Sequence, residues 1–141
     1  MERSSGAAPP RLSGGSGPAP LKVSIEDLRG GVAIVVLAGE LDLAAIPRTH
    51  GAVLEQLRQR QAVLVDLTEL SFIDSSGIGV IMQAFRQSNG TPMHVILGPD
   101  SQVDRVFRLA GIDKVMPVFP DRAEALAALP TWAAQGGERP G

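Results

Sequence analysis

The sequence predicts an α/β domain built on a mixed central β-sheet of about five strands, with about four α-helices. Segments with strand-like and helix-like patterns alternate along residues 21–129, which is typical of this fold class. The strand-like segment 32–38 is apolar throughout, and 62–67 is apolar except at Asp66, as expected for strands that are covered on both faces. Glycine, asparagine and proline separate the segments, as they do in connecting turns.

The length of 141 residues is that of one domain. Both ends of the chain are rich in glycine, proline, serine and alanine, a composition that buries too little apolar surface to offset the entropy of ordering. We therefore expect a disordered N-terminal tail at 1–20, a folded domain at 21–129 and a flexible C-terminal tail at 130–141. Whether Trp132 packs back on the domain is left open by the sequence.

The first half of the domain begins with a strand pair. Residues 21–28 alternate apolar and polar side chains, which indicates a half-exposed strand. Gly30 and Gly31 form a hairpin-type turn into the apolar strand 32–38. Apolar side chains then recur at helical spacing over 45–60, so this segment is predicted to be an amphipathic helix.

The second half continues the alternation. The expected elements are a buried strand 62–67, a helix 77–87, a strand 93–97, a helix 101–110, a short strand 115–119 and a final helix 121–129. Either Asp100 or Ser101 is expected to cap the middle helix. Pro117 favours an edge position for the short strand, because proline cannot donate a ladder hydrogen bond.

Composition excludes several classes of protein. The chain has no cysteine, so disulfides and thiolate metal sites are excluded. The net charge is −2 with both signs mixed along the chain, which argues against direct DNA binding. No apolar run approaches the roughly 18 residues of a membrane span, and the N-terminus lacks the apolar core of a secretory signal. We expect a cytoplasmic protein that does not engage a membrane.

No cofactor or metal site is predicted. His50 and His94 lie in different elements and neither has an i,i+4 partner, so both are interpreted as structural histidines rather than metal ligands. The glycine-rich stretches lack the spacing of phosphate-binding loops.

The stretch FIDSSGIGV, residues 72–80, places an acid and two hydroxyls where a strand gives way to a helix. A nucleophile elbow requires GxSxG, which neither Ser75 nor Ser76 satisfies, so a serine hydrolase is not favoured. Helix capping explains one of Asp74, Ser75 and Ser76 but not all three. Ser76 is our choice for the residual cap.

A second acidic cluster follows the first apolar strand. If strands 32–38 and 62–67 are parallel neighbours, their carboxyl ends meet at one edge of the sheet, where ligands and partners of open α/β sheets bind. Glu40 and Asp42 would then lie close to Asp74. Asp42 is equally suited to capping the helix that follows it.

The helix after Ser75 carries a candidate contact patch. On a helical wheel, Val80, Ile81 and Ala84 face the core, while Ile78 and Met82 flank that arc. The flanking pair is expected to be half exposed beside the serines.

Three segments together resemble the STAS domain, specifically the bacterial anti-sigma factor antagonists. They are GELDLAAIP at 39–47, VLVDLTELSFIDSSGIGVI at 63–81 and VDRVFRLAGIDKVMPVF at 103–119. The resemblance implies a STAS fold over 21–129 and a binding module of transcription regulation, not an enzyme.

The resemblance also implies a mechanism. The anti-sigma factor is a serine kinase of the GHKL type, which phosphorylates Ser75, with Ser76 as second choice. The unphosphorylated form binds this kinase and releases the sigma factor; phosphorylation switches binding off, and a serine phosphatase resets it. The implied partner-binding residues are Asp42, Asp74, Ser75, Ser76, Gly77, Ile78 and Met82.

Two further points follow from the resemblance. Many relatives have a threonine at the position of Ala45, so the helix that begins there is expected to lack its usual cap. The alternative function is a STAS scaffold that is not phosphorylated, such as a stressosome or lipid-transport component.

Overall fold

The computed structural model describes residues 19–134. What we predict for the tails at 1–18 and 135–141 lies outside the described residues. In chain order the elements are β1 Lys22–Leu28, β2 Val32–Leu41, the 3-10 turn η2 Leu43–Ala45, α1 Ile46–Gln59, β3 Ala62–Ile73, α2 Ser75–Arg86, β4 Met93–Ile96, α3 Gln102–Leu109, the 3-10 turn η3 Ile112–Lys114, β5 Val118–Phe119, α4 Arg122–Ala127 and α5 Thr131–Ala134.

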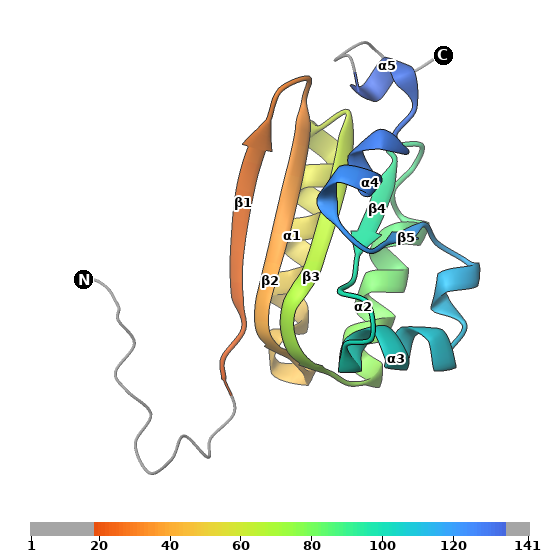
Figure 1. Ribbon diagram of the computed structural model, residues 1–141. Helices are drawn as coiled ribbons and strands as arrows, with labels where there is room; N and C mark the ends of the chain where they lie inside the picture. The colour runs from red at the N-terminus through yellow and green to blue at the C-terminus, as the bar shows by residue number, and fades with distance from the viewer. Residues whose placement is uncertain (1–18, 135–141) are drawn as a thin grey trace.

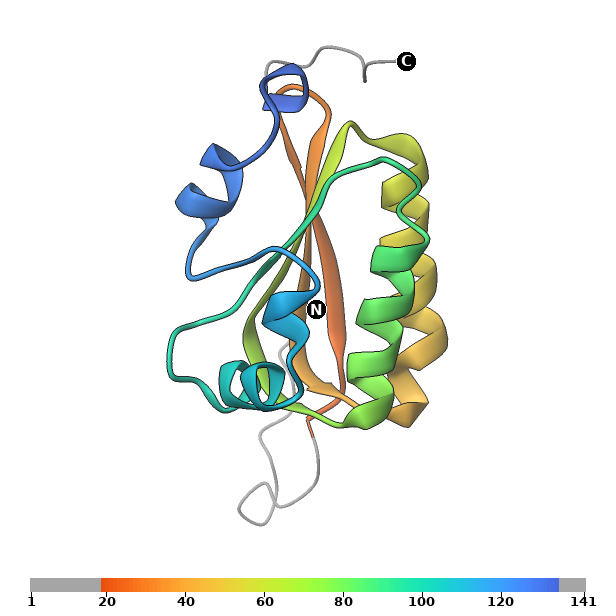
Figure 2. The same cartoon turned by 90° about the vertical axis from the view of Figure 1, so that its right-hand side faces the viewer.

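The predicted fold class is confirmed. The described chain forms one five-stranded sheet in the order β1-β2-β3-β4-β5 (Figure 1). β1 pairs with β2 antiparallel, and the remaining pairs are parallel. Helices α1 and α2 lie side by side on one face of the sheet, and α4 lies on the other (Figure 2).

Two apolar clusters explain why the first halves of β2 and β3 are almost entirely apolar. Residues such as Val35, Leu37 and Val65 belong to the larger cluster, which also contains the buried side chains of α1 and α2. Their strand neighbours, such as Ile34 and Leu64, belong to a second cluster with the C-terminal helices. Because successive side chains of a strand point to opposite faces, a strand that is covered on both faces is apolar at nearly every position, and the buried exception Asp66 is paired with Arg122.

Several elements differ in extent from the prediction. The strand expected at 115–119 is reduced to β5, because Ile112–Lys114 forms a 3-10 turn and the Met116 N–H bonds the Ile112 carbonyl. β2 and β3 are longer than expected and reach Leu41 and Ile73, where they are still paired. Both strands therefore end side by side.

The chain remains folded beyond residue 130, where we expect the flexible C-terminal tail to begin. Thr131–Ala134 form the short helix α5, and Ala133 is fully buried in the second apolar cluster. Trp132 packs against the same cluster. The uncovered apolar face of the sheet is the reason, because it offers these side chains a place to bury.

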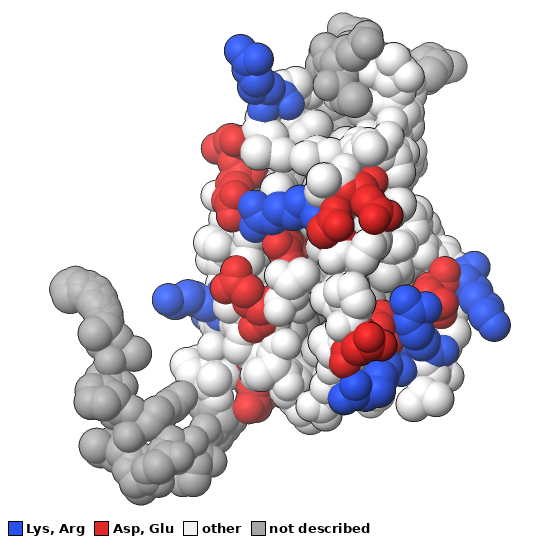
Figure 3. Space-filling model, viewed as in Figure 1, with Lys and Arg blue, Asp and Glu red and all other residues white. Residues whose placement is uncertain are grey.

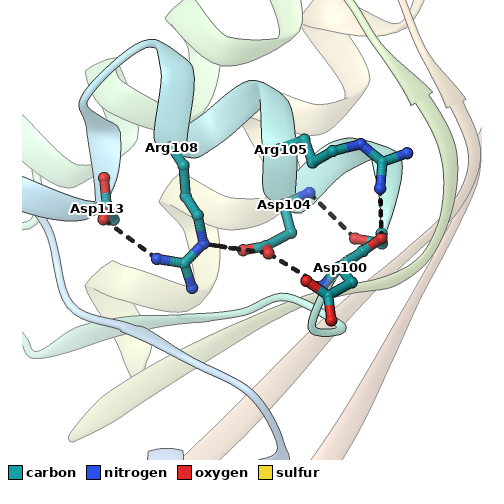
Figure 4. A network of polar contacts seen from close by, with 6 residues as sticks. Asp100, Asp104, Arg105, Arg108 and Asp113 are labelled. Atoms are coloured by element: carbon teal, nitrogen blue, oxygen red, sulfur yellow. Dashed lines mark hydrogen bonds and ion pairs between the residues drawn. The ribbon is translucent and has the colours of Figure 1, made fainter.

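Arginine–carboxylate ion pairs position the C-terminal half of the domain. Arg122 at the start of α4 donates to the buried carboxylate of Asp66 in β3 (2.9 Å) and to Glu26 in β1. In α3, Ser101 accepts the Asp104 N–H and is the N-cap, and Arg108 links Asp104 to Asp113 (Figure 4). Acidic and basic side chains consequently alternate on this face rather than forming a patch of one sign (Figure 3).

Candidate functional site

The candidate site lies where β2 and β3 end. Leu41 and Ile73 are paired across the two strands, and the Asp74 N–H donates to the Leu41 carbonyl at 3.4 Å. Asp42 and Asp74 follow these paired residues directly. The condition for the two acidic segments to meet is fulfilled: β2 and β3 are parallel neighbours, and the segments lie at one edge of the sheet. This edge is at the lower end of the sheet in Figure 1.

Asp74, not Ser76, caps helix α2. Its backbone is extended, and its Oδ1 accepts the Gly77 N–H at 2.9 Å and the Ser76 hydroxyl at 2.6 Å. These two hydrogen bonds, that of Ser76 first, lower the pKa of Asp74. The expectation that Ser76 is the cap, and that the helix begins at Gly77, is therefore wrong: the helix begins at Ser75, and Ser76 already lies within its first turn.

The two serines have different surroundings. The Ser76 side chain is half-buried and its hydroxyl is committed to Asp74. Ser75 is exposed and is the first residue of α2. A group placed on the Ser75 oxygen would face solvent at a helix N-terminus, where negative charge is favoured.

Gly77 is a packing residue. A methyl group at this position would lie 2.7 Å from the Leu41 carbonyl and 2.8 Å from Ile73 Cγ1. The absence of a side chain lets α2 approach the ends of β2 and β3. Gly77 is buried, so a direct contact of this residue with a partner has no support from the geometry.

Ile78 and Met82 are half-buried and pack on the rim of the larger apolar cluster. The helical wheel predicts this placement, since Val80, Ile81 and Ala84 are buried between them and the sheet. Both flanking side chains keep apolar surface at the side of α2.

Asp42 does not use its side chain as a cap. It occupies the N-cap position of η2 without a side-chain hydrogen bond to the turn, and Ala45 at the start of α1 makes none either. Of the two roles considered for Asp42, the capping role is thus not seen, and the uncapped start of α1 is confirmed. Glu40 lies within β2, paired with Phe72. It lines, with Asp42 and Arg48, a groove of about 440 Å³ beside η2.

One exposed apolar side chain at this edge is missed by sequence reasoning. Leu43, the residue after Asp42, is 73% exposed, and the turn that carries it contacts α2. Strand alternation would place Leu43 on the buried face with Leu41. The strand ends at Leu41, however, and the turn that follows buries Ala45 and leaves Leu43 in solvent.

Both histidines have structural partners. His94 is buried, with Nδ1 hydrogen-bonded to the Ala125 carbonyl at 2.9 Å, and its ring lies 4.8 Å from that of Phe119. Burial lowers the pKa of His94. His50 Nε2 lies 2.8 Å from Gln87 Oε1 and thereby joins α1 to the end of α2.

Residues 19–134 contain neither a metal-ligand cluster nor a membrane-spanning helix. No three histidine or carboxylate side chains in this range come together as metal ligands would. No helix in the same range has the length and apolar character needed to cross a bilayer.

Comparison with known proteins agrees with this geometry. The STAS domain family model matches residues 27–125. The chain is 33% identical over 113 residues to the anti-sigma F factor antagonist of Paenibacillus polymyxa, covering 77% of this chain and 95% of that protein.

Solved structures show the same fold. An anti-sigma factor antagonist from Mycobacterium paratuberculosis superposes with a TM-score of 0.72 at 26% identity, over 80% of this chain and 97% of that one. The unphosphorylated form of the anti-sigma factor antagonist SpoIIAA has a TM-score of 0.60 at 22% identity, over 74% and 93% of the two chains. The chain belongs to the STAS domain family.

Proposed function

We propose that this protein is an anti-sigma factor antagonist of the cytoplasm, and that Ser75 is its switch. Its unphosphorylated form binds an anti-sigma factor that is a GHKL-type serine kinase, and the sigma factor is released. Phosphorylation of Ser75 by that kinase ends the interaction, and a serine phosphatase restores it. The protein itself is a binding module without catalytic activity.

The observation that carries this proposal is the contrast between the two serines. A kinase requires a hydroxyl that reaches its active site, and Ser75 is exposed at the first residue of α2. Ser76 is held by Asp74 at 2.6 Å. Local geometry therefore supports Ser75, a choice that the sequence made only through family resemblance. The names of the relatives support an anti-sigma factor as the partner.

Phosphorylation would act through charge. A phosphoserine carries about −1.5 to −2 charges at neutral pH, and the helix N-terminus favours such a charge by about 0.3–1 kcal/mol. A neighbouring carboxylate opposes it: two like charges about 6 Å apart, at an effective dielectric constant near 20, repel by about 3 kcal/mol. In the isolated domain, solvent screens the repulsion between the phosphate and the carboxylate, so the fold tolerates the phosphate. In a desolvated contact with a partner, the same repulsion is not screened. A loss of about 3 kcal/mol in binding free energy corresponds to roughly a hundredfold loss of affinity.

The test uses candidate anti-sigma kinases with ATP, followed by phosphosite mapping and binding measurements. Wild type should acquire one phosphate on Ser75. Ser75→Ala should stay bound in the presence of ATP, and Ser75→Asp should bind roughly a hundredfold more weakly. Ser76→Ala is the matched control, because it leaves the Asp74–Gly77 cap in place and should still be phosphorylated.

Other outcomes would contradict the proposal. Phosphate on Ser76 alone would show that Ser76, not Ser75, is the phosphorylated residue. Binding without phosphorylation would favour the scaffold alternative. Labelling of either serine by a fluorophosphonate probe would indicate a hydrolase.

A further inference from the structure

The surface around Ser75 has one apolar side chain that the proposed switch does not use. Among the large apolar side chains of the described chain, five are exposed: Ile25, Leu43, Phe72, Leu109 and Val115. A single exposed apolar side chain is normal on a protein surface. Its position relative to the site is therefore what matters.

Leu43 is the exposed apolar side chain of the turn beside the switch helix. It follows Asp42, and the turn η2 contacts α2. Leu41, two residues earlier, touches both Gly77 and Asp74 through its carbonyl oxygen. Phe72, by contrast, is paired with Glu40 next to the core-facing pair Leu41 and Ile73, so strand alternation directs it to the other face of the sheet.

The fold holds Leu43 outward. The Asp42 carbonyl accepts the Ala45 N–H at 3.0 Å and closes the turn, and Ala45 is 7% exposed against the core. Once Ala45 faces inward, Leu43 and Ala44 remain on the solvent side. The side chain is therefore presented by a hydrogen-bonded turn rather than by a loose loop, so little ordering is needed when a partner covers it.

The rest of the surface offers little apolar area. Asp42, Asp74 and Ser75 are polar, and Ile78 and Met82 are partly buried against the core. Stable interfaces combine a polar rim with a few buried apolar anchors. Leu43 is the side chain here with the most apolar surface still to bury.

We propose that Leu43 is the apolar anchor of the partner interface, and that it inserts into an apolar pocket on the anti-sigma factor. This inference rests on the proposed function. The anchor contributes before and during phosphoryl transfer equally, since it lies outside the reacting groups. It therefore sets affinity and the choice of anti-sigma factor, whereas Ser75 sets the on and off states.

The experiment compares Leu43→Ala with Leu109→Ala, using the full chain and an anti-sigma kinase that binds wild type. Leu109 is 90% exposed and is the last residue of α3, a different element from η2 and the switch helix α2. Leu43→Ala should weaken binding about tenfold, which equals about 1.4 kcal/mol. It should raise KM for Ser75 phosphorylation by a similar factor with kcat unchanged, the signature of uniform binding. Leu109→Ala should stay within twofold of wild type.

Each other outcome has a distinct meaning. Affinity of Leu43→Ala within twofold of wild type, an equal loss in Leu109→Ala, or a fall in kcat without a change in KM would overturn the anchor and leave the Ser75 switch standing. If wild type binds no anti-sigma kinase, the proposed function fails and the anchor fails with it. Thermal unfolding of both variants should match wild type, since neither side chain is packed.

Discussion

Two aspartates occupy corresponding positions in the site but differ in their hydrogen bonds. Asp42 and Asp74 each follow a strand residue of the same pair, Leu41 and Ile73, and each is an N-cap residue by position. Only Asp74 accepts a backbone N–H with its side chain. The turn after Asp42 is a 3-10 turn and has no such bond, which leaves the Asp42 carboxylate available to a partner.

This difference predicts unequal effects on stability. Asp74→Ala should lower the free energy of unfolding by about 1 kcal/mol, the usual contribution of a side-chain cap. Asp42→Ala should change it by less than about 0.5 kcal/mol. Urea denaturation at pH 7 measures both, and equal losses would contradict the assignment of the cap.

The same comparison has a pH dependence. The pKa of Asp74 lies below its ordinary value of 3.8, so the folded state favours the carboxylate. Its contribution is present above that ordinary value and is lost as the pH falls through the lowered pKa. The gap between wild type and Asp74→Ala should therefore narrow in acid.

At the scale of the element, α2 carries two glycines with opposite surroundings. A methyl group on Gly77 would collide with the Leu41 carbonyl, whereas nothing lies within 4 Å of one on Gly79. Gly77 sets the distance between the switch helix and the strand ends. Gly79 is exposed, and because it has no side chain nothing projects from the helix surface beside Ile78.

Alanine substitutions should separate these roles. Gly77→Ala should destabilise the fold by about 1–3 kcal/mol, as overpacking does. Gly79→Ala should stabilise it by about 0.5–1 kcal/mol, because alanine is the better residue in an exposed helix. Thermal unfolding decides, and a shift of the same sign in both variants would refute the packing role of Gly77.

At the scale of the whole molecule, the C-terminal helices close the second face of the sheet. His94 in β4 joins them to it through the Ala125 carbonyl, and Arg122 does so through Asp66. The switch helix lies on the opposite face (Figure 2). The contacts that hold the C-terminal helices on the sheet therefore lie on one face, and the switch helix that carries Ser75 lies on the other (Figure 2).

His94 should make this closure sensitive to acid. Burial lowers its pKa from 6.5, so the unfolded chain binds a proton that the folded state resists. The stabilising effect is present above pH 6.5 and is lost as the pH falls through the lowered pKa. Urea midpoints between pH 7.5 and 5.5 should fall less steeply for His94→Gln than for wild type. Leu109→Ala, which keeps His94, should follow wild type; identical slopes in all three would contradict the prediction.

The sequence by itself determined the alternation of strands and helices, the largely apolar character of the two central strands and the junction at Asp74 and Ser75. These follow from periodicity and from local chemistry, which are properties of neighbouring residues. The half-exposed placement of Ile78 and Met82 follows in the same way from the geometry of one helix.

Only the tertiary structure decided which acid caps, which serine is exposed, why Gly77 has no side chain and that Leu43 faces solvent. Each depends on where β2 and β3 end relative to each other and on how closely α2 approaches them. The same holds for α5, which forms because the second face of the sheet would otherwise stay uncovered. Contacts between segments distant in the chain set all of these features, and no pattern within a single segment encodes such contacts.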